Sequence, residues 1–513
     1  MATERLGSLS ILCVALTLCA TDRGLTATIS AESEMDALSP EQVGMDSAAL
    51  IEMFDYVRDH QIPVHSVQIV RHGHFALDAY FYPFTPRMRH DVASVTKSIT
   101  STLIGLAIDK GYLPDVHQPV VGLFRNRSVS HLDDRKRLLT VEHLLTMQAG
   151  WDCGVDMKDP RINLDARLAE MRRTADWVQF ALDLPMVADP GSRFAYCNAN
   201  CHLLSALLTQ ATGTNELAFA RKLLFEPLGI RDVDWPADPQ GNSYGWSDLQ
   251  LRPRDMAKLG QMLLQRGRWG RRQIVPEAWL STATAAHVGY TGNDDHYGYF
   301  WWVPGERYPG VFEAVGRGGQ RITVWPARDL VLVFTGGGFD PGDLSKFILK
   351  ALKSDAPLPT DPKTTSRLHN RVEAAAKPPT PHPKAASPAM ETTVSRKLYK
   401  LSPNGLGLTS LALGFNRSAQ ATAEIMWDER PVRIPVGLEG VPLFSDNPLI
   451  KLPQAATGQW LTDDTFELRL DLVGGINFYR ITLKFGVQGR SVQVALSERT
   501  GLNEETFTGV TSE

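Results

Sequence analysis

Hydrophobic and polar positions follow two different periods along the chain, and the change of period predicts its organisation. The segment SVQIVRHGHFALDAYF (66–81) alternates on both sides of His72-Gly73, which predicts a β-hairpin. GQRITVWPARDLVLVFTGG (319–337) predicts a second hairpin. Between them lie helical patterns, several of which end in glycine, a common helix stop. Strands at both ends with helices between them predict, for residues 36–353, an α/β (α+β) domain in which helices flank an antiparallel sheet.

A period of two returns in the C-terminal part of the chain, after a change of composition. Residues 354–395 hold eight prolines together with Ala, Lys and Thr. This composition predicts a semi-stiff linker, with one or two helical turns in LHNRVEAAAK (368–377). From residue 396 to 513, apolar residues recur at alternate positions in successive segments, so we predict a small antiparallel β domain, either a barrel or a sandwich. The segments on either side of a Gly474-Gly475 turn carry Phe466, Leu468, Leu470 and Leu472, then Tyr479, Ile481, Leu483 and Phe485.

The first residues are typical of a targeting segment. MATERLGSLSILCVALTLCA has a short head containing Arg5, followed by an apolar run that suits the core of a signal peptide and is too short to span a bilayer. We therefore predict that residues 1–31 are a signal peptide and that the protein is exported, to the periplasm or the medium. A disordered or membrane-associated start is the alternative. Three alanines are candidates for the last residue of the signal: Ala20, Ala27 and Ala31.

Composition and charge exclude some classes of partner. The chain is 43% hydrophobic and 21% charged, which is ordinary for a globular protein. Its net charge is −4 and its pI is about 6.4, so the basic stripe expected of a nucleic-acid-binding protein is not indicated. No segment after the signal is long and apolar enough for a membrane span. We predict no nucleic-acid partner and no stable membrane span.

The stretch DVASVTKSIT (91–100) holds the first chemical candidate. Ser94 lies three residues before Lys97 at the start of a predicted helix. One interpretation is an N-cap serine followed by a solvated lysine. However, a capping serine is commonly partnered by Glu or Gln three residues on, and a lysine there opposes the helix dipole. An unfavourable residue of this kind indicates function, and a neutral Lys97 would take the proton of a nucleophilic Ser94.

Two further motifs carry polar groups next to predicted element ends. In GSRFAYCNANC (191–201), Tyr196 and Asn198 lie just before a helix, where a tyrosine can act as a base and an amide can hold a substrate. A buried tyrosine and a capping asparagine are the alternatives. The second motif, VGRGGQRI (315–322), opens an apolar strand with two glycines, which often mark close approach of a ligand.

The Arg-Gly-Gly-Gln run within that second motif suggests two further roles. The backbone N–H of Gln320 would form an oxyanion hole with the N–H of Ser94. Arg317 would bind a carboxylate with its two-pronged guanidinium. A bulged strand end carrying a surface arginine is the alternative. The candidate substrate and oxyanion residues are Asn198, Arg317, Gly318, Gly319 and Gln320.

The order of these motifs resembles the serine β-lactamase and penicillin-binding-protein superfamily, and most closely its class C β-lactamase-related serine hydrolases. Ser-x-x-Lys followed by a basic-x-Gly strand motif is a signature of this superfamily. Further phrases that are similar are TVEHLLTMQAGWDCG, RDMAKLGQMLLQRGRWG, YGYFWWV and GRGGQRITVWPARDLVLV. The resemblance covers residues 36–353 and implies a β-lactamase/transpeptidase-like fold. The C-terminal β domain is similar to the lipocalin-like appendages of some members.

The resemblance also implies roles for individual residues. Ser94 would attack a carbonyl carbon and form an acyl-enzyme, while Lys97 and Tyr196 would share the work of general base. Tyr196 would then activate the deacylating water, and Asn198 would orient Lys97 and the substrate amide. The backbone N–H groups of Ser94 and Gln320 would hold the oxyanion. No cofactor is implied.

One departure from the family pattern bears on the substrate. The third motif is Arg317-Gly318-Gly319, where β-lactamases have Lys-Thr-Gly and use the lysine and hydroxyl to hold the carboxylate of the drug. Arginine differs from lysine in shape, and Gly318 has no hydroxyl. We therefore predict an esterase, amidase or D-amino-acid peptidase that acts on a small ester, amide or short peptide. A non-catalytic peptide- or cell-wall-binding or regulatory homologue, and a true β-lactamase, are the alternatives.

Three cysteines remain after the predicted signal, and two of them flank motifs of the expected site. We predict a disulfide between Cys153 and Cys197, which would join the GWDCG loop to the loop of Tyr196. A metal cluster of Cys197, Cys201 and His202 is the alternative. Because that spacing fits no standard zinc pattern, we predict no metal site.

Overall fold

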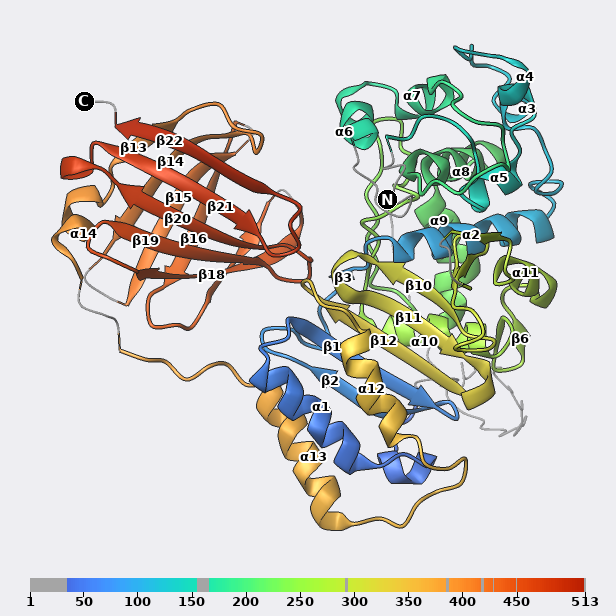
Figure 1. Cartoon of the computed structure of the whole chain (residues 1–513), viewed down its shortest axis with the longest axis horizontal. Coiled ribbons are helices and arrows are strands. Elements are labelled where there is room, and N and C mark those ends of the chain that lie inside the picture. Colours follow the sequence, from blue (N-terminus) through green and yellow to red (C-terminus); the bar gives the residue numbers. More distant parts are fainter. Residues whose placement is uncertain are drawn as a thin grey trace, which may run out of the picture. The chain divides into compact units, whose positions relative to one another are not determined.

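The computed structural model describes two parts of the chain, an α/β part and an all-β part (Figure 1). The predicted signal peptide, residues 1–31, lies outside the described residues. Within the part that is described, no helix is both long enough and apolar enough to cross a bilayer. The described residues are 35–154, 166–290, 294–383, 387–416, 419–427, 429–448 and 450–511.

The α/β part is built on one antiparallel sheet of eight strands, in the order β2-β1-β12-β11-β10-β9-β8-β7. Both predicted hairpins are present as neighbouring strands, and β1 from the first pairs with β12 from the second, with Val67 opposite Phe334. Segments far apart in the sequence are therefore neighbouring strands of the sheet. The strands are β1 (Val64–Arg71), β2 (His74–Tyr80), β7 (Val288–Gly289), β8 (His296–Tyr297), β9 (Trp302–Val303), β10 (Phe312–Gly316), β11 (Gln320–Trp325) and β12 (Leu330–Gly336).

Helices cover both faces of this sheet, as Figure 1 shows, which confirms the predicted fold class. One face carries α1 (Ser47–Asp59), α12 (Gly342–Ala351) and α13 (Pro362–Ala375), with a core of their apolar side chains and those of β1, β2 and β12. The other carries α2 (Val95–Asp109) and α10 (Pro253–Leu264), and α8 (Asn198–Thr212) packs on α2. Because layers cover β1 and β12 from both sides, every residue of these strands is buried.

Smaller elements fill the region between α2 and α8 and the short strands. The helices there are α3 (Val120–Leu123), α4 (Asp134–Arg137), α5 (Val141–Leu145), α6 (Ala166–Arg173), α7 (Trp177–Asp183), α9 (Glu216–Ala220) and α11 (Glu277–Ala283). The two-residue strands are β3 (His90–Asp91), β4 (Gln250–Leu251), β5 (Arg268–Trp269) and β6 (Arg272–Gln273). The pairing of β3 with β4 brings the segment before α2 next to residues 244–251, and both segments contribute to the site described below.

Helix α13 is longer than the one or two turns predicted for residues 368–377. Asp361 caps its N-terminus by accepting the N–H of Lys363, and Pro362 occupies the first turn, where its missing N–H costs nothing. Leu368 is buried on this helix, within the core formed with α1. The predicted helix was too short because the proline-rich composition favoured a linker. The helix is stabilised by its N-terminal cap and by packing, neither of which the composition indicates.

The all-β part is a closed barrel, which decides between the two predicted forms. Its ten strands follow the order β16-β15-β14-β13-β22-β21-β20-β19-β18-β17, and a pairing of Gly437 on β16 with Thr457 on β18 closes the circle. Inward-facing residues alternate along the strands, as on β21, where Val492, Val494 and Leu496 are buried.

A short helix, α14 (Ala389–Val394), precedes the barrel. The strands of the barrel are β13 (Leu398–Leu401), β14 (Leu408–Phe415), β15 (Gln420–Trp427), β16 (Arg430–Gly437), β17 (Leu443–Asn447), β18 (Leu452–Trp460), β19 (Thr465–Leu472), β20 (Phe478–Phe485), β21 (Ser491–Glu498) and β22 (Glu504–Thr511).

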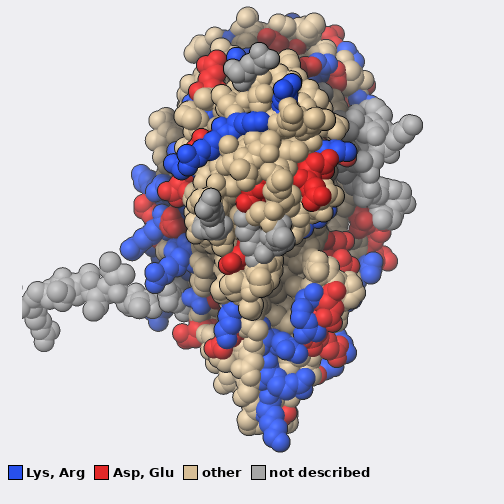
Figure 2. Space-filling model, turned by 90° about the vertical axis from the view of Figure 1, so that its left-hand side faces the viewer, with Lys and Arg blue, Asp and Glu red and all other residues tan. Residues whose placement is uncertain are grey.

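On the face of the molecule shown in Figure 2, basic and acidic side chains are interspersed and do not form a single basic stripe.

Candidate active site

Ser94 lies in a tight turn directly before helix α2. The residue before it, Ala93, has a φ of +47°, a conformation that costs a non-glycine residue about 1–3 kcal/mol. The carboxylate of Asp91 accepts the N–H of Ala93 at 2.7 Å and supports this turn. Ser94 occupies the N-cap position, but its side chain makes no capping hydrogen bond. Its hydroxyl is therefore available for another partner, contrary to the simple capping interpretation.

That partner is Lys97, one helical turn further on. The side-chain nitrogen of Lys97, Nζ, donates to Ser94 Oγ at 2.9 Å and to the backbone carbonyl of Trp246 at 3.0 Å. The side chain of Lys97 is buried, with 1% of its surface exposed. No carboxylate among the described residues forms an ion pair with it. The helix geometry and the Trp246 carbonyl together hold Lys97 Nζ against the hydroxyl of Ser94.

Tyr196 completes a group of three side chains around this contact. Lys97 Nζ lies 4.7 Å from the centre of the Tyr196 ring, within the range of a cation–π interaction. The ring of Trp302 also stacks on Tyr196, at 5.7 Å between centroids. Asn198, two residues later, is the first residue of α8 and is buried. The structure thus brings Ser94, Lys97 and Tyr196 together from two helix starts.

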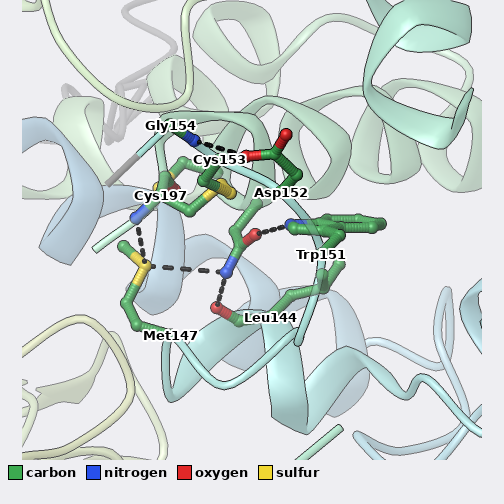
Figure 3. Close-up of a disulfide and its surroundings, with 9 residues drawn as sticks. Leu144, Met147, Trp151, Asp152, Cys153, Gly154 and Cys197 are labelled. Atoms are coloured by element: carbon green, nitrogen blue, oxygen red, sulfur yellow. Dashed lines mark hydrogen bonds between the residues drawn. A yellow bond between two sulfur atoms is a disulfide. The ribbon is translucent and has the colours of Figure 1, made fainter. Parts of the chain in front are cut away.

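A disulfide fixes the segment that carries Tyr196. Cys153 and Cys197 are joined, with their Cα atoms 5.7 Å apart, as Figure 3 shows. Hydrogen bonds reinforce the same junction: the N–H of Cys197 donates to Met147 Sδ at 3.3 Å, and the Trp151 indole donates to Asn200 Oδ1 at 2.8 Å. Both the 147–153 loop and the start of α8 are therefore held in one position.

The other two residues of the alternative metal cluster have different surroundings. Cys201 is a free, buried thiol, and burial raises its pKa to about 12. His202 Nε2 lies 3.0 Å from Asp238 Oδ2 in a fully buried pair. Across the residues that the structure describes, no three His, Cys, Asp or Glu side chains are grouped so as to hold a metal ion.

The Arg-Gly-Gly-Gln run forms the turn between β10 and β11, and it lies against the Ser94 turn. A Cβ placed on Gly316 would come within 2.5 Å of the Val92 carbonyl and 3.0 Å of Ala93 Cβ, so the two segments are in direct contact. Gly318 and Gly319 have φ values of +84° and +97°, which glycine adopts without strain. Gln320 anchors the turn with its buried amide, which donates to the Gly336 carbonyl at 2.5 Å and accepts the Gly336 N–H at 3.2 Å.

Arg317 makes contacts that the sequence did not predict. Its Nη2 donates to Asn477 Oδ1 and its Nη1 to Thr500 Oγ1, both at 2.6 Å. Both partners belong to loops of the C-terminal barrel. The guanidinium predicted to bind a substrate carboxylate is thus paired within the protein.

Asp91 is a residue that the sequence reasoning missed. Loss of hydration on burial raises the pKa of its carboxyl to about 7, and nearby Asp248 adds to the rise. The N–H of Ala93 and the charge of Arg317 act in the opposite direction. The signal in the sequence was an Asp two residues before Ala93, a spacing at which Asp commonly accepts a backbone N–H in a turn.

Comparisons with known proteins show which proteins this chain is similar to. The chain is 27% identical over 290 residues to 6-aminohexanoate-dimer hydrolase of Paenarthrobacter ureafaciens, a match that covers 53% of this chain and 72% of that protein. It is 28% identical over 249 residues to esterase EstB of Burkholderia gladioli, covering 42% of this chain and 60% of that protein. The solved structure of EstCE1, a hydrolase with promiscuous acyltransferase activity, matches with a TM-score of 0.50 and 18% identity over 60% of this chain and 99% of that one, a likeness of fold.

A family model gives the broadest of these matches. The model described as Beta-lactamase matches residues 45–352, which is more than half of the chain. The matched range contains the Ser94–Lys97 contact, the Tyr196 segment and the strand turn at Arg317. The chain therefore belongs to the Beta-lactamase family, whose members include serine hydrolases and penicillin-binding-protein-like enzymes.

Proposed function

We propose that this protein is a serine hydrolase that forms an acyl-enzyme on Ser94 and acts on small esters or amides. One observation carries the proposal: Lys97 Nζ lies 2.9 Å from Ser94 Oγ in a buried setting at the start of a helix. A nucleophile within hydrogen-bond reach of a base that is itself oriented by a third group is the arrangement that covalent catalysis requires. Here the third group is the Trp246 carbonyl, which fixes the lysine.

The proposed reaction has two halves. Ser94 Oγ bonds to the substrate carbonyl carbon while its proton passes to Lys97 Nζ, and the carbonyl oxygen becomes an oxyanion held by the N–H groups of Ser94 and Gln320. The carbon–oxygen or carbon–nitrogen bond to the leaving group then breaks, and the leaving group takes a proton from Lys97 or Tyr196. In the second half, water loses a proton to whichever of Lys97 and Tyr196 protonated the leaving group, and it attacks the ester carbon. The bond between that carbon and Ser94 Oγ then breaks as Lys97 returns a proton to Oγ, which releases the acid and a free Ser94.

Ester and amide substrates are supported by the relatives, one named 6-aminohexanoate-dimer hydrolase and one named esterase EstB. Short D-amino-acid peptides belong to the same chemical class. We also propose that the protein is exported. The disulfide between Cys153 and Cys197 supports this, because such bonds persist in oxidising compartments.

The test is a substrate panel on wild type and Ser94→Ala. The panel holds p-nitrophenyl esters, the aminohexanoate dimer, D-alanyl amides and nitrocefin, and a fluorophosphonate probe reports covalent labelling. We expect wild type to turn over at least one ester or amide and to be labelled once, and Ser94→Ala to do neither. Equal labelling of both proteins, or none of the wild type, would exclude the acyl-enzyme and favour a non-catalytic homologue.

A further inference from the structure

Two loops at one end of the C-terminal barrel reach the turn that carries Arg317. Residues 473–477 connect β19 to β20, and residues 499–503 connect β21 to β22. Asn477 from the first loop and Thr500 from the second each accept a hydrogen bond of 2.6 Å from Arg317, one on each terminal nitrogen. One N–H on each terminal nitrogen of the guanidinium is therefore already used within the protein, on the side from which a carboxylate would compete for these donors.

The barrel also supplies the counter-charge for this arginine. Glu498, at the end of β21, has a fully buried carboxylate, and its Oε1 lies 3.9 Å from Arg317 Nη1. Its other oxygen accepts the N–H of Thr500 at 2.8 Å and the Thr500 hydroxyl at 2.5 Å. A buried carboxylate thus orients Thr500 and places a negative charge beside the guanidinium, where it would repel a substrate anion.

Steric contact also closes the corner of the site formed by Arg317 and Gly318. A side chain at Gly318 would clash with Ile476, which is buried at the tip of the first loop. The carbonyl of Gly474 in that loop accepts the N–H of Asp91 at 2.6 Å. The barrel loop therefore contacts the turn on which Ser94 depends, and it places an apolar side chain where a polar recognition group would otherwise lie.

We infer that these two barrel loops form a wall of the active site and determine its specificity by closing the corner at which a carboxylate beside the scissile bond would bind. The substrates favoured by this wall are esters or amides that are neutral and apolar on the side facing Arg317 and Ile476. A carboxylate there would have to compete with Asn477 and Thr500 for the terminal nitrogens of the arginine. This inference rests on the proposed serine hydrolase function.

A pair of substrates tests the inference on the unmodified protein. Nitrocefin carries a carboxylate next to its scissile amide nitrogen, and in its methyl ester that group is neutral and larger by one methyl. We expect the methyl ester to acylate Ser94 faster than nitrocefin by at least about tenfold, measured as the second-order acylation rate. Equal rates, or a preference for the free acid, would overturn the inference.

Substitutions in the two barrel loops test the same inference by removing the contacts to Arg317. In the double variant Asn477→Ala, Thr500→Ala, both hydrogen bonds to Arg317 are lost and the guanidinium becomes available. The nitrocefin rate should then rise relative to its methyl ester by about tenfold. Adding Arg317→Gln should abolish that gain, because the gain depends on the cation. Ile476→Ala, a milder change, should give a smaller rise and covers the case in which the double variant does not fold.

A matched control and a label separate the ways in which the experiment can fail. Thr462 lies in a loop at the opposite end of the barrel and donates to Asp464 at 2.7 Å, so Thr462→Ala removes a comparable hydrogen bond and should leave the ratio of the two rates unchanged. Fluorophosphonate labelling of Ser94 is measured on every variant. Absence of labelling in wild type defeats the proposed function itself, whereas normal labelling with an unchanged rate ratio in the loop variants defeats only the role of the barrel.

Discussion

The carboxyl of Asp91 offers a test that links folding, pH and the geometry of Ser94. Its pKa is raised from 3.8 to about 7, chiefly by burial and then by Asp248. A raised pKa means that the folded protein binds this proton more tightly than the unfolded chain does. The stability from this group is therefore complete below about pH 4 and is lost as the pH rises through about 7. Asp91→Asn keeps an oxygen acceptor for the Ala93 N–H and cannot ionise.

The size of the effect follows from the difference between the two pKa values. At 1.36 kcal/mol for each pH unit, the wild type loses about 4 kcal/mol of unfolding free energy between pH 4 and pH 8 from this group. Asp91 is partly buried, and the water that still reaches it screens part of its charge, so we expect a loss on the order of 2–4 kcal/mol. Glu216 and Asp471, whose pKa values burial raises to about 7 and about 6, titrate equally in both proteins. Their contribution cancels when the variant is compared with wild type.

The assay is urea unfolding of wild type and Asp91→Asn at pH 4.5, 6 and 8. The free energy of unfolding of Asp91→Asn, relative to that of wild type, should increase at each step to higher pH. A difference between the two proteins that stays constant across this range would refute the raised pKa. Activity gives the second readout, with Asp91→Ala as the contrast. Losing the acceptor leaves the strained Ala93 turn unsupported, so Asp91→Ala should lower kcat/KM by about 10–100-fold and Asp91→Asn by only a few-fold. Equal activity of the two variants would show that the hydrogen bond does not hold the turn.

Most of the fold could be predicted because local patterns specify it. The period-two segments around His72-Gly73 and after Gly319 are hairpins in the structure, and the alternation after residue 396 is a series of paired strands. The barrel closes where β16 meets β18, two strands that are not consecutive, with Gly437 paired to Thr457. No local pattern encodes such a contact, so barrel and sandwich could not be separated beforehand.

In the candidate site, too, local contacts could be predicted from the sequence and long-range contacts could not. Ser94 and Lys97 are one helical turn apart, so their contact follows from the helix itself. The hydrogen bond between Arg317 and Asn477 joins residues 160 positions apart in two different parts of the fold. From the sequence alone, we predicted that Arg317 binds a substrate carboxylate. The burial that raises the pKa of Asp91 also arises from distant segments, including the barrel loop at Gly474.

Two further substitutions test the site and its support. Lys97→Met keeps the length and removes the amine, so kcat/KM should fall by about 10²–10⁴, while Lys110→Met at the exposed end of the same helix should leave it unchanged; equal activities would remove Lys97 from the mechanism. The second test replaces Cys153 and Cys197 with alanine. Their bond closes a loop of 44 residues, for which chain entropy gives a stabilisation of about 4 kcal/mol. We expect the free energy of unfolding in urea to fall by about 2–4 kcal/mol. We also expect kcat to fall more than the labelling yield, because Tyr196 directly precedes Cys197 and loses its anchored position. A loss of stability with unchanged kcat would show that the disulfide supports the fold without positioning Tyr196, and no loss of stability would show that the 147–153 loop is held by the Met147 and Trp151 hydrogen bonds alone.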